Sequence, residues 1–236
     1  MTSRLIVALD FPNLDSCRKI LEELKGLVKI YKVGSELFTA EGWRAVELVR
    51  RSGAEVFLDL KLHDIPTTVA KTARVIANHD VFMFNVHALG GLEMMREAKK
   101  AVDEASKGRR RPLLVGVTIL TSHKEGELSR ELGISRPLKE EVLALAKGAK
   151  EAGLDGAVCS PEEIEILKKG MGGKFILVTP GIRPEGIGLD DQSRVMTPKQ
   201  ALQKGADYLV LGRPVTASSH PRRTVEEILK NWQSQA

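Results

Sequence analysis

The sequence contains little cysteine, few aromatic residues and no long apolar run. Of its 236 residues, two are cysteines and 4% are aromatic. Cys17 and Cys159 are too few for a disulfide framework and lack a C-x-x-C spacing, which excludes a disulfide-stabilised scaffold and favours a reducing compartment. The first apolar run spans five residues and stops before Asp10, too short for a signal sequence or a membrane span. We therefore expect a cytoplasmic protein with no membrane partner.

Charge of one sign does not dominate the chain either. The net charge is +5, from 36 Lys and Arg against 31 Asp and Glu, and the densest basic run is "KGRRRP" at 107–112. Because no aromatic residues are interleaved with these cations, the run is more typical of a solvated loop than of a nucleic-acid surface. We expect no nucleic-acid partner.

The residues that are present alternate between strand-like and helix-like patterns. Apolar content is 42%, and no Pro-, Gly- or Ser-rich linker divides the chain, so residues 1–236 are expected to form a single domain. Stretches with apolar residues spaced by three and four, such as 14–26, 41–53, 91–105 and 138–153, predict helices between short β-branched runs. The runs predicted as strands are 5–9, 29–34, 55–61, 81–87, 112–120, 156–160, 174–180 and 207–213.

A weak internal repeat supports eight strand–helix units. "SGAEVFLDL", "AGLDGAVCS" and "KGADYLVLG" each place a glycine, at 53, 153 and 205, shortly before a strand. Glycine there can take the left-handed conformation that ends a helix, after which a short turn leads into the next parallel strand. Eight such units predict an α/β fold of the (β/α)8 TIM barrel type. An open doubly wound sheet is the alternative, but no G-x-G-x-x-G follows the first strand.

Unusual polar residues stand where the predicted strands end. Asp10, Lys32, Asp59 and Lys61 close the first three strands, and Asn85 closes the fourth. In a TIM barrel the carboxyl ends of the strands carry the chemistry, so these side chains are expected to meet at one face.

The last two strands end in motifs suited to phosphate. In "TPGIR" and "LGRP", Gly181 and Gly212 allow close backbone approach, while Arg183 and Arg213 offer guanidinium groups to phosphate oxygens. TIM barrels usually hold a phosphate after strands seven and eight. The long polar segment 181–194 is expected to close over it as a lid, with Gln192 reaching in.

The stretch "VFLDLKLHDIPTTV" concentrates charge at the end of an apolar strand. Alternation along a strand places Asp59 and Lys61 on the same side, whereas Asp64 lies beyond the regular pattern. With Lys32 on the neighbouring strand, Lys32, Asp59, Lys61 and Asp64 can alternate in sign. Such an array suits replacement of an anionic leaving group by a proton, and a structural salt-bridge network is the alternative.

"DLKLHDIPTTV" resembles the D-x-K-x-x-D-I-P-x-T signature of the orotidine 5′-monophosphate decarboxylase family, in its short bacterial form. "IVALD", "YKVG", "LTS", "TPGIR", "DDQ", "TP" and "LGRP" follow in the family's order across nearly the whole chain. The resemblance implies decarboxylation to uridine 5′-monophosphate, the last step of de novo pyrimidine biosynthesis, without metal or organic cofactor. It also implies a homodimer in which Asp64 serves the partner's site.

The same resemblance implies roles for single residues. Lys61 would deliver the proton to the pyrimidine, with Asp59 and Asp64 beside the scissile carboxylate. The substrate-binding residues implied are Asp10 and Lys32 at the ribose; Thr67 and Thr68 near the ribose and the subunit boundary; Thr121 or Ser122 at the pyrimidine; Arg183, Gln192, Gly212 and Arg213 at the phosphate; and, elsewhere along the substrate, Ile65, Pro66 and Pro180.

Two other functions remain open at this point. A magnesium-dependent sugar-phosphate decarboxylase or hexulose-phosphate synthase shares D-x-K-x-x-D. In that group an acidic residue stands at the position of Lys32, so the lysine in this chain disfavours this alternative. His63 and His87 could ligate a metal, yet no His or Cys cluster supports them. A non-enzymatic barrel that binds a phosphoribosyl ligand would need the arginines but not the charged array.

Overall fold

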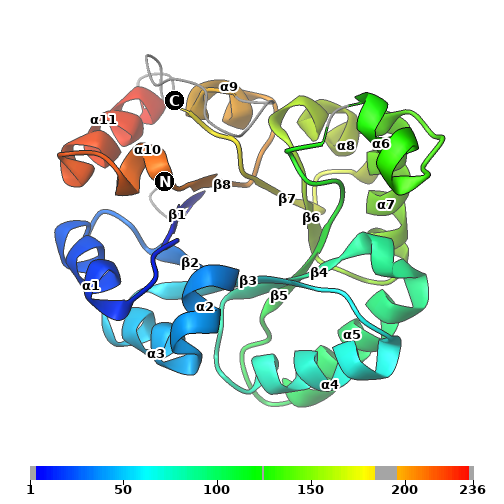
Figure 1. Ribbon diagram of the computed structural model, residues 1–236, viewed down its shortest axis with the longest axis horizontal. Helices are drawn as coiled ribbons and strands as arrows, with labels where there is room; N and C mark the ends of the chain where they lie inside the picture. Colours follow the sequence, from blue (N-terminus) through cyan, green and yellow to red (C-terminus); the bar gives the residue numbers. More distant parts are fainter. Residues whose placement is uncertain (1–3, 124, 184–195, 234–236) are drawn as a thin grey trace.

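The strands form one closed parallel barrel, as the sequence predicts. The computed structural model describes residues 4–123, 125–183 and 196–233. Eight strands follow in chain order around the barrel, and β8 pairs back with β1 (Figure 1). They are β1 (Leu5–Ala8), β2 (Ile30–Gly34), β3 (Glu55–Leu62), β4 (Met83–His87), β5 (Leu113–Val117), β6 (Gly156–Val158), β7 (Ile176–Thr179) and β8 (Tyr208–Leu211).

Helices surround the strands as an outer ring (Figure 1). They are α1 (Leu14–Glu23), α2 (Ser35–Glu41), α3 (Trp43–Arg51), α4 (Pro66–Ala77), α5 (Gly91–Ala105), α6 (Glu125–Leu132), α7 (Leu138–Glu151), α8 (Ile164–Met171), α9 (Pro198–Gln203), α10 (Arg213–Thr216) and α11 (Pro221–Gln233), with short 3₁₀ turns η2 (Ala88–Gly90) and η3 (Pro161–Glu163). Within the described ranges, no helix combines the length and apolar character that a membrane crossing needs.

Most element boundaries differ from the sequence prediction by one to three residues. The helix predicted over 41–53 forms as α3 over Trp43–Arg51, and Gly42, at φ +57°, separates it from α2. The last strand ends at Leu211 rather than at Arg213, and Arg213 instead opens α10. A turn at this point aims the Gly212 backbone and the Arg213 side chain at the barrel mouth, which a continued strand would not do.

The glycines of the internal repeat have the conformation that the repeat predicts. Gly53, Gly153 and Gly205 have φ values of +81°, +83° and +107°. Each follows a helix and precedes a strand, so the helix-to-strand turn depends on a left-handed residue at the same place in three units.

Apolar side chains fill the barrel interior and, separately, the layer between strands and helices. The outer layer contains alternate strand residues such as Leu5, Val7 and Leu58 packed on the helices. The inner layer consists of Ile6, Ala8, Ile30, Phe57, Met83, Val115, Val178 and Val210. Because these side chains fill the interior of the barrel, a ligand can bind only at the ends of the barrel.

Candidate active site

A cavity of about 570 Å³ opens at the carboxyl ends of the strands. Ten of the sixteen residues predicted for the site line it: Asp10, Lys32, Asp59, Lys61, Thr121, Ser122, Pro180, Arg183, Gly212 and Arg213. They come from the ends of β1, β2, β3, β5, β7 and β8, so residues up to 203 positions apart in the chain share one site.

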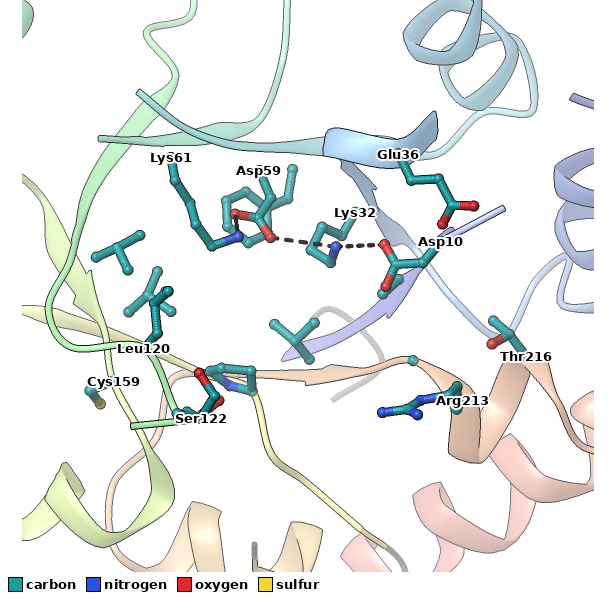
Figure 2. Close-up of a pocket in the computed structure, with 18 of the residues that line it drawn as sticks. Asp10, Lys32, Glu36, Asp59, Lys61, Leu120, Ser122, Cys159, Arg213 and Thr216 are labelled. Atoms are coloured by element: carbon teal, nitrogen blue, oxygen red, sulfur yellow. Dashed lines mark hydrogen bonds and ion pairs between the residues drawn. The ribbon is translucent and has the colours of Figure 1, made fainter. Parts of the chain in front are cut away.

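Four charged side chains alternate in sign along one wall of this cavity (Figure 2). The Nζ of Lys32 lies 2.9 Å from Oδ1 of Asp10 and 3.4 Å from Oδ2 of Asp59. Lys61 Nζ donates to the other Asp59 oxygen, Oδ1, at 2.8 Å. We call Asp10, Lys32, Asp59 and Lys61 the charged array. The sequence suggested Asp64 as the fourth member, next to Lys61. In the structure the fourth member is Asp10, next to Lys32 at the other end of the array.

The two central members of the charged array are the most buried. The side chains of Lys32 and Asp59 are each 11% exposed. Burial alone would raise the pKa of Asp59, but Lys32, Lys61 and a hydrogen bond from Asn85 outweigh it and lower that pKa. Burial would lower the pKa of Lys32, but the Asp59 and Asp10 carboxylates raise it. Both groups therefore remain ionised at neutral pH.

Gly34 leaves room for the Lys32 and Asp10 contact. A Cβ at Gly34 would lie 2.7 Å from Lys32 Nζ and 2.9 Å from Asp10 Oδ1. The backbone there, at φ −94° and ψ −177°, is extended and open to any residue. Space for the charged array, rather than backbone conformation, therefore requires glycine at this position.

The turns after β7 and β8 bring two arginines to the cavity. Arg183 is 7% exposed and follows Gly181, whose φ is +78°. Its backbone amide donates to Met196 O at 2.9 Å, which fixes the turn. Arg213 lies across the cavity from Lys61 (Figure 2). A ligand that spans the cavity thus meets the Arg213 guanidinium at one end and Lys61 at the other (Figure 2).

Five predicted residues lie outside the cavity of the single chain. Asp64, Ile65, Thr67 and Thr68 are exposed and Pro66 is half-buried, at the start of α4. The Asp64 carboxylate accepts a hydrogen bond from the amide of Ile65 at 2.6 Å rather than contacting the charged array. Gln192 and the lid predicted over 181–194 fall largely outside the described residues.

Sequence reasoning missed the apolar lining of the cavity. The inward residues Ala8, Phe57, Val117, Val158 and Val210 form its floor, and strand alternation could have identified them. The other missed lining residues are Glu36, Ile119, Leu120, Cys159 and Thr216. A floor without hydrogen-bonding groups is expected to exclude water from the groups above it.

His63 and His87 lie together near the charged array. Their rings stack with centroids 5.5 Å apart. Burial, together with the neighbouring His63, Lys61 and His123, lowers the pKa of His87 to about 4. Over 4–123, 125–183 and 196–233, no group of three or more His, Cys, Asp or Glu side chains is arranged to hold a metal ion.

A closed parallel barrel with charged groups and two arginine-bearing turns at the carboxyl ends of its strands defines the class of (β/α)8 enzymes that act on anionic substrates. Residues 3–228 match the family model described as "Orotidine 5'-phosphate decarboxylase / HUMPS family", and the chain belongs to this family.

Relatives of similar length carry the same description. The chain is 50% identical over 231 residues to "Orotidine 5'-phosphate decarboxylase" of Legionella pneumophila, covering 98% of this chain and 100% of that one. It is 46% identical over 233 residues to the protein so named from Dictyoglomus thermophilum, covering 98% and 94%. The crystal structure of orotidine 5'-phosphate decarboxylase from Lactobacillus acidophilus superposes with a TM-score of 0.86 at 39% identity, covering 98% and 100%.

Proposed function

We propose that this protein decarboxylates orotidine 5′-monophosphate to uridine 5′-monophosphate and CO₂, the last step of de novo pyrimidine biosynthesis, without metal or organic cofactor. The observation that carries the proposal is the position of Lys32. Its ammonium lies between the Asp10 and Asp59 carboxylates and neutralises two oxygen donors that a divalent cation could otherwise bind. Because Asp59 also binds Lys61, its two oxygens are both engaged by cations of the chain itself.

The proposed reaction uses the charged array directly. The bond between C6 of the pyrimidine and the carboxylate carbon breaks, CO₂ leaves, and the electron pair stays on C6. Lys61 Nζ then gives its proton to C6, and solvent restores the proton to Lys61. The Asp59 carboxylate repels the substrate carboxylate before the bond breaks, and Lys61 stabilises the charge that develops on C6.

The ends of the substrate would be held by the remaining lining residues. Asp10 would accept hydrogen bonds from the ribose hydroxyls, and Lys32 would donate hydrogen bonds to them. Thr121 or Ser122 would contact the pyrimidine. Pro180, Arg183, Gln192, Gly212 and Arg213 would surround the phosphate, with the segment 181–194 as a lid. The phosphate is remote from C6, but the free energy of its binding would lower the activation barrier for the reaction at C6.

Ultraviolet absorbance of orotidine 5′-monophosphate with the purified protein, with and without EDTA, tests the proposal. We expect loss of the orotate chromophore at equal rates in both buffers. No change on orotidine 5′-monophosphate, together with turnover of a ketose or aldose phosphate that requires magnesium, would instead support the sugar-phosphate branch. Tight binding of the nucleotide without turnover would support a binding protein.

Gly34 provides a first test of the charged array. Gly34→Ala is expected to lower kcat/KM by about tenfold to 10²-fold, because the new methyl group displaces Lys32 and Asp10 from their contact. The free energy of unfolding should change by less than about 1 kcal/mol, since alanine fits the backbone there. Gly173→Ala, where a Cβ meets nothing within 4 Å, is the matched control. Equal kcat/KM in the two variants would contradict the prediction.

A homodimer with shared sites is part of the proposal. Ile65, which precedes α4, and Val75, on α4, are 66% and 48% exposed, and Leu89 in η2 is 38% exposed. Asp64 and Thr67 stand beside Ile65 and are likewise exposed. These elements follow the adjacent strands β3 and β4, and exposed apolar side chains there accompany the residues that the single-chain cavity leaves out.

Mixing two inactive variants tests whether Asp64 serves the partner. Lys61→Ala and Asp64→Asn protein, unfolded together and refolded at equal amounts, should regain about a quarter of wild-type activity, because each mixed dimer contains one site with both native residues. Refolding each variant alone is the control. Activity no greater than the mean of the two variants would place Asp64 in its own chain's site.

Cytoplasmic location and the absence of a nucleic-acid partner complete the proposal. Cys17 and Cys159 are both free and buried, which suits a reducing compartment. The three arginines of 109–111 bind within the chain, to Asn78, Glu55 and Asp155 respectively. These contacts support a structural role for the basic loop.

A further inference from the structure

Asn85 is a buried polar residue in contact with two members of the charged array, yet it does not line the cavity. It is 1% exposed and lies on β4 between Phe84 and Val86. Its Nδ2 donates to Asp59 Oδ1 at 2.6 Å, and its Oδ1 accepts from the backbone amide of Lys61 at 2.7 Å. Both partners lie on β3, at the end that carries the proposed chemistry.

Strand β3 leaves its regular pairing where Asn85 meets it. Leu58 pairs with Phe84 and Leu62 pairs with Val86, so four positions along β3 correspond to two along β4. Within this interval Lys61 has a φ of +51°, a left-handed conformation that lysine seldom adopts. At this break in the pairing, the Asn85 side chain accepts a hydrogen bond from the backbone amide of Lys61. Without that bond the amide would lack this partner, and an unpaired buried N–H is unfavourable.

The chemistry of the two contacts requires a side chain that both donates and accepts a hydrogen bond, as an amide does. A backbone N–H can only donate, and an ionised carboxylate can only accept, so the residue between them must accept from one and donate to the other. Aspartate at position 85 would keep the contact with Lys61 but would oppose the Asp59 carboxylate. Leucine, of similar size, would lose both contacts.

We infer that Asn85 is a positioning residue that fixes the Asp59 carboxylate and the Lys61 backbone relative to one another. Through these two hydrogen bonds it aims the proton donor and the repelling carboxylate into the cavity. The inference rests on the proposed function for its effect on turnover, but its structural content, the hold on Lys61, stands separately. Sequence reasoning saw Asn85 only as a polar residue at a strand end.

The test compares Asn85→Leu and Asn85→Asp with a matched control. Thr118→Val removes another buried polar contact, Thr118 Oγ1 to Val158 O at 3.0 Å, just after β5 and with no member of the charged array in that contact. Both Asn85 variants should lower kcat by about 10²-fold, while KM changes by less than about threefold, because misplaced reacting groups affect the chemical step more than phosphate binding. Thr118→Val should lower thermal stability with kcat within about threefold of wild type.

A second measurement does not depend on turnover. In protein labelled with ¹⁵N-lysine, hydrogen exchange at the Lys61 amide should accelerate at least about tenfold in Asn85→Leu, where the acceptor is lost, and by less in Asn85→Asp, where it remains. The aspartate variant should also shift the acid limb of its kcat profile toward neutral pH, because two adjacent carboxylates share a proton.

The outcomes separate the two proposals. Wild-type kcat in Asn85→Leu, or unchanged exchange at Lys61 in that variant, would overturn the positioning role. If Asn85→Leu does not fold, Asn85→Asp tests the positioning role instead, and a wild-type kcat with a wild-type pH profile in that variant would overturn it. Wild-type protein inactive on orotidine 5′-monophosphate, but with the expected exchange pattern, would overturn the proposed function and leave the hold of Asn85 on Lys61 supported.

Discussion

Replacement of Lys61 by alanine is expected to abolish decarboxylation of orotidine 5′-monophosphate while leaving uridine 5′-monophosphate binding largely intact. In the proposed mechanism the variant loses the proton donor and its positive charge, and we expect kcat to fall by about 10⁴-fold or more. Asp59 retains Lys32 and Asn85 as partners, so the variant should remain folded. Ultraviolet absorbance of the orotate chromophore gives kcat, and titration calorimetry gives the affinity for uridine 5′-monophosphate.

Lys139→Ala, a substitution at an exposed lysine of α7, is the matched control and should leave both measurements unchanged. Two results would contradict the role of Lys61. One is turnover within tenfold of wild type; the other is a loss of product affinity as large as the loss of kcat, which would make Lys61 a binding residue.

Replacement of Arg213 by alanine should reduce kcat/KM for orotidine 5′-monophosphate by about 10²-fold or more, the loss expected for a charged hydrogen bond to phosphate. Arg213 lies at the end of the cavity opposite Lys61, so its effect must pass through the phosphate rather than through C6 (Figure 2). The nucleoside orotidine, which lacks the phosphate, should therefore react equally slowly with wild type and with the variant.

Parallel assays of both substrates make this prediction specific. Arg223→Ala, at a guanidinium exposed on α11, serves as the control for loss of a positive charge and should change neither rate constant. An equal loss on orotidine and on its phosphate would show that Arg213 acts through the fold or through the pyrimidine end, and the assignment of the phosphate grip would fail.

Much of the fold could be predicted from local patterns because each strand–helix unit repeats the same local chemistry. Gly53, Gly153 and Gly205 end helices in the left-handed conformation that their place in the repeat predicts. Parallel strands with carboxyl ends at one face then bring Asp10, Lys32, Asp59 and Lys61 together. The boundary error at Arg213 arose because the strand-like sequence pattern continues into the turn without marking it.

Alternation along β3 predicted the common side of Asp59 and Lys61, and both do line the cavity. It could not predict how they meet. The irregular pairing between Leu58 and Leu62, and the left-handed Lys61, depend on contacts with β4 that have no local signature. The same limit applies to Asp64, whose place beyond the regular alternation gave no direction for its side chain.

The sequence by itself determined the barrel, the strand ends that carry charge and the family, because these follow from periodicity, glycine positions and ordered motifs. Only the tertiary structure decided that Lys32 lies between two carboxylates, that Gly34 must leave space for that contact, and that Asn85 holds both Asp59 and Lys61. Those facts are distances between residues on different strands, and the packing of the closed barrel fixes them.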